Sequence, residues 1–252
     1  MADLHEIVAF ANDLLMVSDF KDYSPNGLQV EGKKNVSRVV TGVSACLELF
    51  EMAVKKNADA VIVHHGMFWD SDPRVVRGSF KARLKLLLEN EISLLGYHLP
   101  LDRNPEIGNN IQLVKTMGLL DPVPFGIYAG KSISYIGSFN PPVATCDFME
   151  IVKNKIWDKA RHYDFGAEKI SRVALCSGSA PELLREAISA GADAYVTGED
   201  TEWVYHLARE EKIHYIVAGH HATERFGIKK LGEKIGDKFG VEVEFVDIPN
   251  PI

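Results

Sequence analysis

Two segments of the chain repeat the same order of apolar and polar positions. In residues 36–66, the β-branched run VSRVV is followed by a Ser/Gly turn, by apolar residues at three- and four-residue spacing, and by a second apolar run, AVIVHH. Residues 170–200 follow the same order, from ISRVALC through PELLREAISA to AYVTGE, at an offset of 170 − 36 = 134 residues without a gap. The helical spacing predicts a helix and the apolar runs predict strands, so each copy is expected to form a β-α-β unit.

Local signals mark the ends of the predicted helices. Pro181 suits the first turn of a helix, and Asn57 and Gly191 stand where a helix ends in a left-handed residue. A β-α-β connection places its two strands parallel. We therefore expect an α/β fold of two similar β-α-β-based domains related by the offset of 134 residues (170 − 36).

The remaining segments carry simpler patterns. Residues 4–17 predict an amphipathic helix, and residues 225–239 predict the last helix. The segment SISYIGSFNPPVATCDFMEIVKNKIWDKA predicts a strand, a turn at its Pro-Pro pair and a helix, and VEVEFVDI predicts an edge strand.

Histidines and carboxylates follow the predicted strands, where parallel sheets form their ligand sites. Six such residues stand at three strand ends: His64, His65, His98, Asp102, His220 and Glu224. The last four form two His-x-x-x-carboxylate patterns, 220 − 98 = 122 residues apart, so the first copy carries a loop twelve residues longer, around FWDSDPRVVRGSFK. Imidazole with carboxylate suits zinc, iron or manganese, and six donors exceed the three or four that one ion needs. A dinuclear site is favoured.

Several neighbouring residues are left open or assigned other roles. His221 is a further candidate ligand, and Glu199 is either a partner of a ligand or solvated. The alternative for all the histidines is that they cap strand ends by bonding backbone groups, but five of the nine fall in these short motifs. Trp69 and Tyr97 are interpreted as packing residues. The other histidines lack a carboxylate at a useful spacing and are expected on the surface or in the core: His5, His162, His206 and His214.

Composition narrows the function classes. The chain has 252 residues, 46% of them hydrophobic and 25% charged, as in an ordinary globular protein. Its net charge of −7 argues against general nucleic-acid binding, which needs cationic side chains on phosphates. Its three cysteines form no CxxC pattern and indicate neither a disulfide framework nor a thiolate zinc site. The start MADLHEIVAF lacks the basic region of a signal peptide, and no apolar run reaches the ~18 residues of a membrane span, so a cytoplasmic protein without membrane contact is expected.

An ordered set of motifs resembles a known family. NGLQVEG, VIVHHGMFW, YHLPLD, GNN, TGED and GHHATER occur in this order along nearly the whole chain. Together they resemble the GTP cyclohydrolase I type 2 family, also called the NGG-interacting factor three-like or dinuclear metal-centre family.

The resemblance implies a fold, an assembly and a metal site. It implies two α/β domains forming a cleft, with residues 1–100 and 217–252 in one domain and residues 101–216 in the other, and a ring-shaped homohexamer. It also implies two divalent ions per subunit, with His98 in the site but not a direct ligand. The metal ligands that it implies are His64, His65, Asp102, His220 and a bridging Glu224.

The family name implies an activity. Metal-activated water would attack C8 of the guanine ring of GTP, open the ring and release formate, with His98 as a candidate proton carrier. Two divalent ions against two carboxylates leave a positive site suited to a nucleotide or another phosphate-bearing small molecule. Two other classes stay open: a metal-binding protein that handles iron or another ion without turnover, and an interaction module braced by its metals.

Overall fold

The computed structural model describes residues 1–252, which divide into two compact units. Unit 1 comprises Met1–Leu101 and Gly227–Pro249, and unit 2 comprises Asp102–Phe226 and Asn250–Ile252. The chain returns from unit 2 to unit 1 inside one continuous helix, α9 (His220–Phe239), between Phe226 and Gly227.

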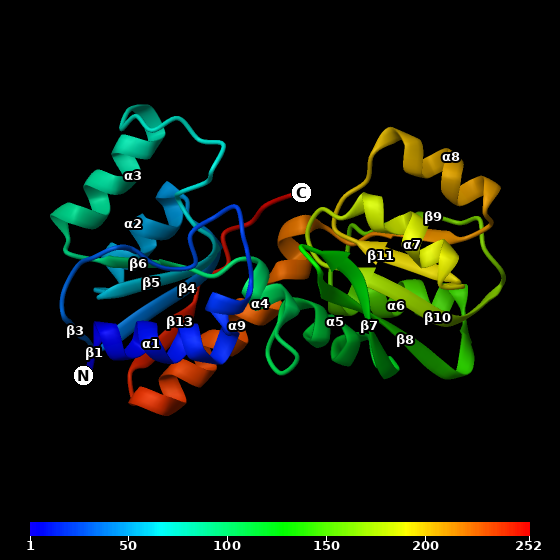
Figure 1. Cartoon of the computed structure of the whole chain (residues 1–252), viewed down its shortest axis with the longest axis horizontal. Helices are drawn as coiled ribbons and strands as arrows, with labels where there is room; N and C mark the ends of the chain where they lie inside the picture. The colour runs from blue at the N-terminus through cyan, green and yellow to red at the C-terminus, as the bar shows by residue number, and fades with distance from the viewer. The chain divides into compact units, whose positions relative to one another are not determined.

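Unit 1 is built on a five-stranded sheet in the order β13-β4-β5-β6-β2. Its strands are β2 (Gly27–Val30), β4 (Arg38–Ser44), β5 (Ala60–His65), β6 (Ser93–Gly96) and β13 (Glu242–Phe245), with the small pair β1 (Ala2–Asp3) and β3 (Asn35–Val36) beside them. Its helices are α1 (Leu4–Leu15), the short η1 (Val17–Asp19), α2 (Leu47–Lys55), α3 (Gly78–Glu89) and most of α9. Helices α2 and α3 cover one face of the sheet and α1 and α9 the other (Figure 1).

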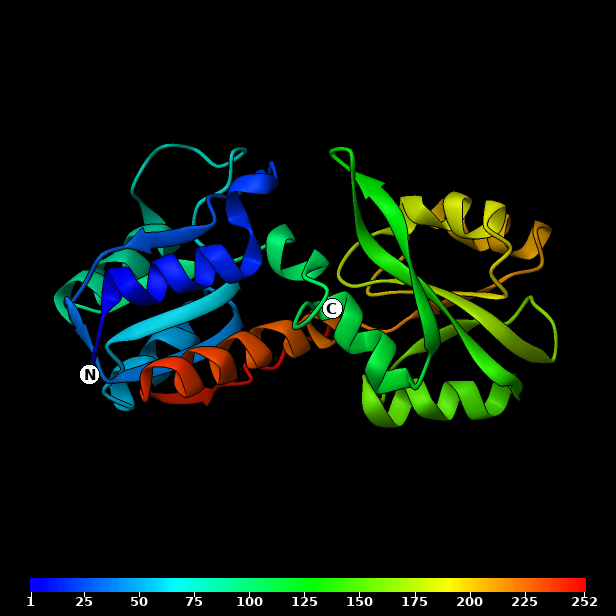
Figure 2. The ribbon, with the colours of Figure 1, turned by 60° about the horizontal axis from the view of Figure 1, so that its bottom comes forward.

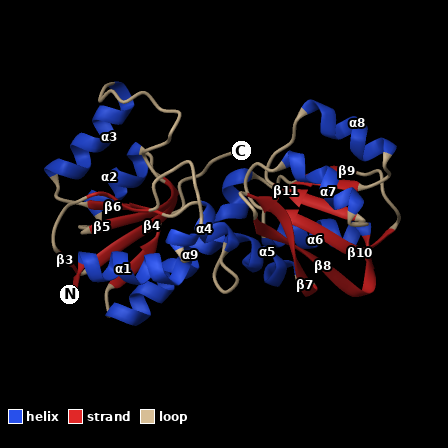
Figure 3. Ribbon diagram, in the orientation of Figure 1, coloured by secondary structure: helices blue, strands red, loops and turns tan.

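Unit 2 is built on a six-stranded sheet in the order β7-β8-β10-β11-β12-β9. Its strands are β7 (Leu120–Tyr128), β8 (Lys131–Ala144), β9 (Arg161–Tyr163), β10 (Lys169–Cys176), β11 (Ala194–Thr197) and β12 (His214–Val217). Its helices are α5 (Asn109–Met117), α6 (Thr145–Lys155), the short η2 (Pro181–Leu183), α7 (Leu184–Ser189) and α8 (Glu202–Glu210), and α4 (Leu99–Arg103) crosses the boundary between the units. One apolar cluster holds α5 and α6 against one face of the sheet, and another holds α7 and α8 against the other face (Figures 2 and 3).

The internal repeat is confirmed down to its register. In the first copy β4 and β5 pair in parallel with Val39 opposite Ala60, and in the second copy β10 and β11 pair in parallel with Val173 opposite Ala194. Both pairs are separated by 134 residues (173 − 39 and 194 − 60). The fold is therefore the expected α/β architecture with two similar β-α-β units.

One aspartate in each copy anchors the first strand to the turn before the second. Asp59 accepts hydrogen bonds from the backbone amides of residues 37 and 38 at 2.8 and 3.1 Å. Asp193 accepts from the amides of residues 171 and 172 at 2.9 and 2.8 Å. The helix-ending positions are also as predicted, since Asn57 and Gly191 have φ values of 53° and 70°.

Two element predictions need correction. The Pro-Pro pair, Pro141 and Pro142, is not a turn: it lies within β8, where the register against β10 shifts. A register shift tolerates proline because the local ladder hydrogen bonds are already interrupted. The last helix, α9, begins at His220 and not at residue 225. None of the helices is long and apolar enough to cross a membrane.

Candidate metal centre

His64 and His65 are held at the carboxyl end of β5. The strand is buried along its length, and the His64 side chain lies in the interior, where its Nδ1 is 2.9 Å from the Tyr97 carbonyl oxygen. Because a carbonyl only accepts, Nδ1 carries the proton and Nε2 the metal-competent lone pair. Nδ1 of His65 lies 3.2 Å from the Ser44 hydroxyl, and the two imidazole rings are 4.6 Å apart.

His98 joins this pair through the loop after β6. Its Nδ1 lies 2.9 Å from Oδ1 of Asp22, and both side chains are buried. The ring nitrogens of His64, His65 and His98 include a set within 4.8 Å of one another. Unit 1 therefore gathers three of the six predicted residues into one group.

Asp22 is a functional candidate that the sequence analysis does not contain. Besides His98 it accepts hydrogen bonds from the Leu99 amide and the Asn26 side chain, at 2.9 and 3.0 Å. Burial raises the pKa of its carboxyl, but the hydrogen bond and charge of His98 and the other donors outweigh burial and bring the pKa below its ordinary value. No sequence signal marks Asp22, because it lies in an irregular loop 76 residues before its partner.

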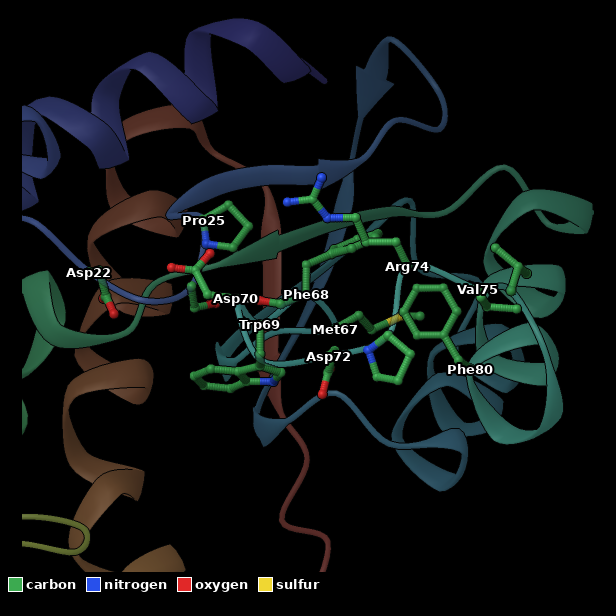
Figure 4. A pocket seen from close by; sticks show the side chains of 13 residues that line it. Asp22, Pro25, Met67, Phe68, Trp69, Asp70, Asp72, Arg74, Val75 and Phe80 are labelled. Carbon is green, nitrogen blue, oxygen red and sulfur yellow. Dashed lines mark hydrogen bonds between the residues drawn. The ribbon is translucent and has the colours of Figure 1, made fainter.

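A cavity of about 620 Å³ opens in unit 1, and Asp22 and Trp69, which both contact His98, are among its lining residues (Figure 4). Asp22 lies in its wall, and the long loop of the first copy supplies the aromatic rings of Phe68 and Trp69 together with Arg74. Trp69, interpreted from sequence as a packing residue, lies edge-on to His98 with 5.2 Å between the ring centres. The cavity has the size and mixed lining of a small-molecule site.

Asp102 is oriented by two donors within unit 2. It lies in α4, and its Oδ1 accepts hydrogen bonds from Nδ2 of Asn109 at 2.9 Å and from the Ser177 hydroxyl at 3.1 Å. The carboxylate is buried. Asn109 belongs to the GNN motif, so this motif supports a carboxylate.

His220 and Glu224 share one face of the first turns of α9. Their four-residue spacing brings Nε2 of His220 to 3.2 Å from Oε2 of Glu224. Nδ1 of His220 is hydrogen-bonded to Glu199, so Glu199 is the partner of a candidate ligand. Burial lowers the pKa of His220, but the charges and hydrogen bonds of Glu224 and Glu199 outweigh burial and raise it to about 9. Glu224 and Glu199 therefore favour positive charge at this position.

Asp102 and Glu224 also lie close together. Candidate ligand oxygens of the two residues are within 4.8 Å of each other. The buried Cys176 thiol beside them has its pKa raised by burial and by both carboxylates, which keeps it protonated and a poor ligand. Unit 2 therefore gathers the other three predicted residues.

His221, the further candidate ligand, has one backbone contact with the end of the chain. Its amide donates to the carbonyl of Ile252 at 3.0 Å.

Gly178 is packed against this second group. Its φ is +66°, and a Cβ at this position would overlap Oε1 of Glu224 and lie 3.2 Å from Nε2 of His220. Only glycine leaves the carboxylate where it is.

Two histidines assigned to surface or core also meet a carboxylate. His162 and His214 face each other across β9 and β12, and Oδ1 of Asp164 lies 3.2 Å from Nδ1 of His214. The surface-or-core expectation holds for His214, which is buried, and His162 is half-buried. The contact between His214 and Asp164 forms across an antiparallel pair of strands, so sequence spacing does not show it.

The sequence pattern of Duf34/NIF3 (NGG1p interacting factor 3) matches residues 2–251. The chain belongs to the Duf34/NIF3 family. The resemblance read from the motifs is thereby confirmed.

Relatives of this Duf34/NIF3 chain are similar over their whole length. Proteins named "GTP cyclohydrolase 1 type 2 homolog" from Yersinia pestis and Pseudomonas aeruginosa are 44% and 45% identical over 247 and 248 residues, which is 98% of this chain and 98% of each relative. The solved structure titled protein ybgI, of unknown function, superposes with a TM-score of 0.94 at 41% identity, covering 100% of both chains. The protein TTHA1606 from Thermus thermophilus gives 0.92 at 34% identity, again covering 100% of both chains.

Proposed function

We propose that this protein is a metal-dependent hydrolase that opens the guanine ring of GTP and releases formate. The observation that carries the proposal is the pair of buried donor groups, each with its own orienting partners. The names of the Yersinia pestis and Pseudomonas aeruginosa relatives support the choice of substrate.

We assign two divalent ions to the five ligands His64, His65, Asp102, His220 and Glu224. Their donor set of imidazole and carboxylate suits zinc, iron or manganese. A hydrogen-bond partner at Nδ1 fixes each of three imidazole rings, as metal sites require. The partner is a carbonyl for His64, a hydroxyl for His65 and a carboxylate for His220.

Glu224 is the ligand that we assign to both ions. A carboxylate has two oxygens and can span two metals, whereas the second nitrogen of an imidazole serves an outer partner. Asp102 is better suited to one ion, because its Oδ1 already accepts from Asn109 and Ser177. Two divalent ions against these two carboxylates leave a net positive site, which favours a nucleotide triphosphate.

When bound, the ions would supply a water-derived nucleophile at neutral pH and polarise the bond under attack. His98 is the residue that we assign to proton transfer. Asp22 accepts from its Nδ1, which fixes the ring and presents Nε2 as the atom that takes and returns a proton. Addition of one water at C8 and cleavage of the C8–N9 bond would open the ring to a formamide, and a second water would hydrolyse the formamide C–N bond to release formate and leave the amine.

The cavity in unit 1 supplies a place for the base and phosphates. Phe68 and Trp69 offer aromatic surfaces for a purine ring, and Asp70 and Asp72 offer acceptors for the N–H groups of guanine. Arg74 is the cation suited to a phosphate.

A homohexamer is also part of the proposal. Strand β7 lies at the edge of its sheet and exposes Leu120, Val123 and Ile127 by 49%, 53% and 60%. Exposed apolar side chains on this strand favour burial against another chain, here a second copy. Light scattering of the wild type and of Val123→Lys tests this point, and a monomeric wild type at micromolar concentration contradicts it.

Formate release tests the activity. Purified protein loaded with manganese, zinc or iron is incubated with GTP, and formate is measured over time. His98→Asn is expected to lower kcat by about 10²- to 10⁴-fold with the metals retained. The matched control is His206→Gln, an exposed histidine on α8, which is expected to leave turnover unchanged. No formate with any metal, together with transfer of metal to an apo acceptor, would replace the proposal by the metal-handling function.

A further inference from the structure

Three metal-competent side chains converge in unit 2, apart from the ligands assigned to the proposed hydrolase. They are His162 and Asp164, on and just after β9, and His214 at the start of β12. Nε2 of His162 and Nδ1 of His214 are 3.1 Å apart, and Oδ1 of Asp164 lies 3.2 Å from the latter and 4.0 Å from the former.

The sheet register explains the convergence. In the antiparallel pair β9–β12, Tyr163 lies opposite Tyr215, so the next position along brings Asp164 opposite His214. His162 is two residues before Asp164 and shares its face of the strand, which makes His162 and His214 diagonal neighbours. All three side chains therefore project from the same face of the sheet.

The protonation state of His214 favours a cation. Its Nε2 lies 2.8 Å from the Ala167 carbonyl oxygen, which can only accept, so Nε2 carries the proton and Nδ1 is a lone pair. That lone pair accepts from the Gly166 backbone amide at 3.4 Å and also faces Nε2 of His162 and a carboxylate oxygen. A metal ion bound here would have two imidazole nitrogens and one carboxylate oxygen as ligands.

The loop after β9 encloses the His214 ring. It provides Asp164, the Ala167 carbonyl and Gly166, whose backbone amide lies 3.4 Å from Nδ1 of His214. A Cβ at Gly166 would come within 2.5 Å of Cδ2 of the ring, so the backbone rests directly on the imidazole. A donor nitrogen fixed by a carbonyl behind it is the usual arrangement of a metal-binding histidine.

The spacing of the three atoms suits zinc. Metal–donor bonds of 2.0–2.2 Å in tetrahedral geometry place donor atoms roughly 3.3 Å apart. Two of the three distances, 3.1 and 3.2 Å, are close to this value. The 4.0 Å distance involves Asp164, whose side chain is 68% exposed and has room to rotate inwards.

We propose that His162, Asp164 and His214 bind one further divalent transition-metal ion of the zinc class, with the fourth position open to water or an external donor. The ion links the short edge strand β9 and its loop to β12. This set shares no residue with the ligands of the proposed hydrolase, so the GTP assay and this proposal stand or fall separately.

Zinc content and affinity of the full chain test the site. Asp164→Asn and His162→Gln each change a side chain at the edge of the sheet. Each is expected to weaken the binding of one zinc equivalent per chain about tenfold or more, so that this equivalent is lost on dialysis. Each ligand substitution is made both in the wild-type chain and in the Glu224→Gln chain. Comparing the zinc content of the two series separates zinc at this site from zinc held by the proposed hydrolase ligands. The control is His206→Gln, which removes an exposed histidine that lies 3.9 Å from Glu202.

A second measurement covers variants that fold poorly. Added zinc is expected to raise the melting temperature of Glu224→Gln, and Asp164→Asn in that background is expected to abolish the rise. Equal zinc content and affinity in the parent and both ligand variants would overturn the site in favour of a plain hydrogen bond between His162 and His214. An equal loss in His206→Gln would overturn it in favour of non-specific surface binding.

Discussion

Replacing Gly178 by alanine tests whether close packing holds Glu224 in place. Gly178 has a left-handed φ of +66°, and so does Gly191, at +70°. A Cβ at Gly191 would meet nothing within 4 Å, whereas a Cβ at Gly178 would overlap a carboxylate oxygen of Glu224. The two substitutions therefore share a backbone cost and differ in one contact.

The expected losses of unfolding free energy follow from the backbone cost and the contact with Glu224. A left-handed alanine costs about 1–2 kcal/mol, which is the whole expected effect of Gly191→Ala. Gly178→Ala adds the overpacking of a buried side chain, about 1–3 kcal/mol. The difference between the variants, about 1–3 kcal/mol, isolates the contact with Glu224.

Urea denaturation in the presence of a chelator gives both unfolding free energies, and a metal titration of each folded variant gives the affinities. Gly178→Ala is expected to lose affinity for the metals because it displaces Glu224, while Gly191→Ala retains wild-type affinity. Equal unfolding free energies for the two variants, with metal binding intact in both, would refute the reasoning.

Four other substitutions test three separate features. Glu224→Gln is expected to weaken both proposed ions together and Asp102→Asn mainly one, as read from metal content after dialysis; two ions retained by Glu224→Gln would reverse the assignment. Asp193→Ala removes the acceptor of two backbone amides and is expected to lower the unfolding free energy by about 1–3 kcal/mol in urea, and an unchanged midpoint would contradict its anchoring role. Burial raises the pKa of Asp200, but hydrogen bonds led by that from Tyr163 outweigh it and lower the pKa below 3.8. The carboxylate therefore stabilises the fold above about pH 3.8 and loses this contribution as the pH falls through its folded pKa. Asp200→Asn is expected to reduce the fall in unfolding free energy at acid pH by less than about 1 kcal/mol. An unchanged acid dependence of the unfolding free energy would refute this role of Asp200.

The repeat, its parallel strands and the positions of the six candidate residues could be predicted from the sequence. Each depends on local periodicity or on a residue at a strand end, and both signals lie within a few positions along the chain. Asp22 and Asp164 could not be predicted, because each meets its histidine through tertiary structure. Strand β9 is too short to leave a pattern, so the proximity of His162 and His214 appears only in the folded sheet.

The two copies share one register and one anchoring aspartate, yet they do not present the same donors at their strand ends. Position 65 is a histidine in the first copy, and the equivalent position 65 + 134 = 199 in the second is a glutamate that orients another histidine. The two halves are therefore alike in backbone and unequal in chemistry, so neither copy supplies the side chains of the other.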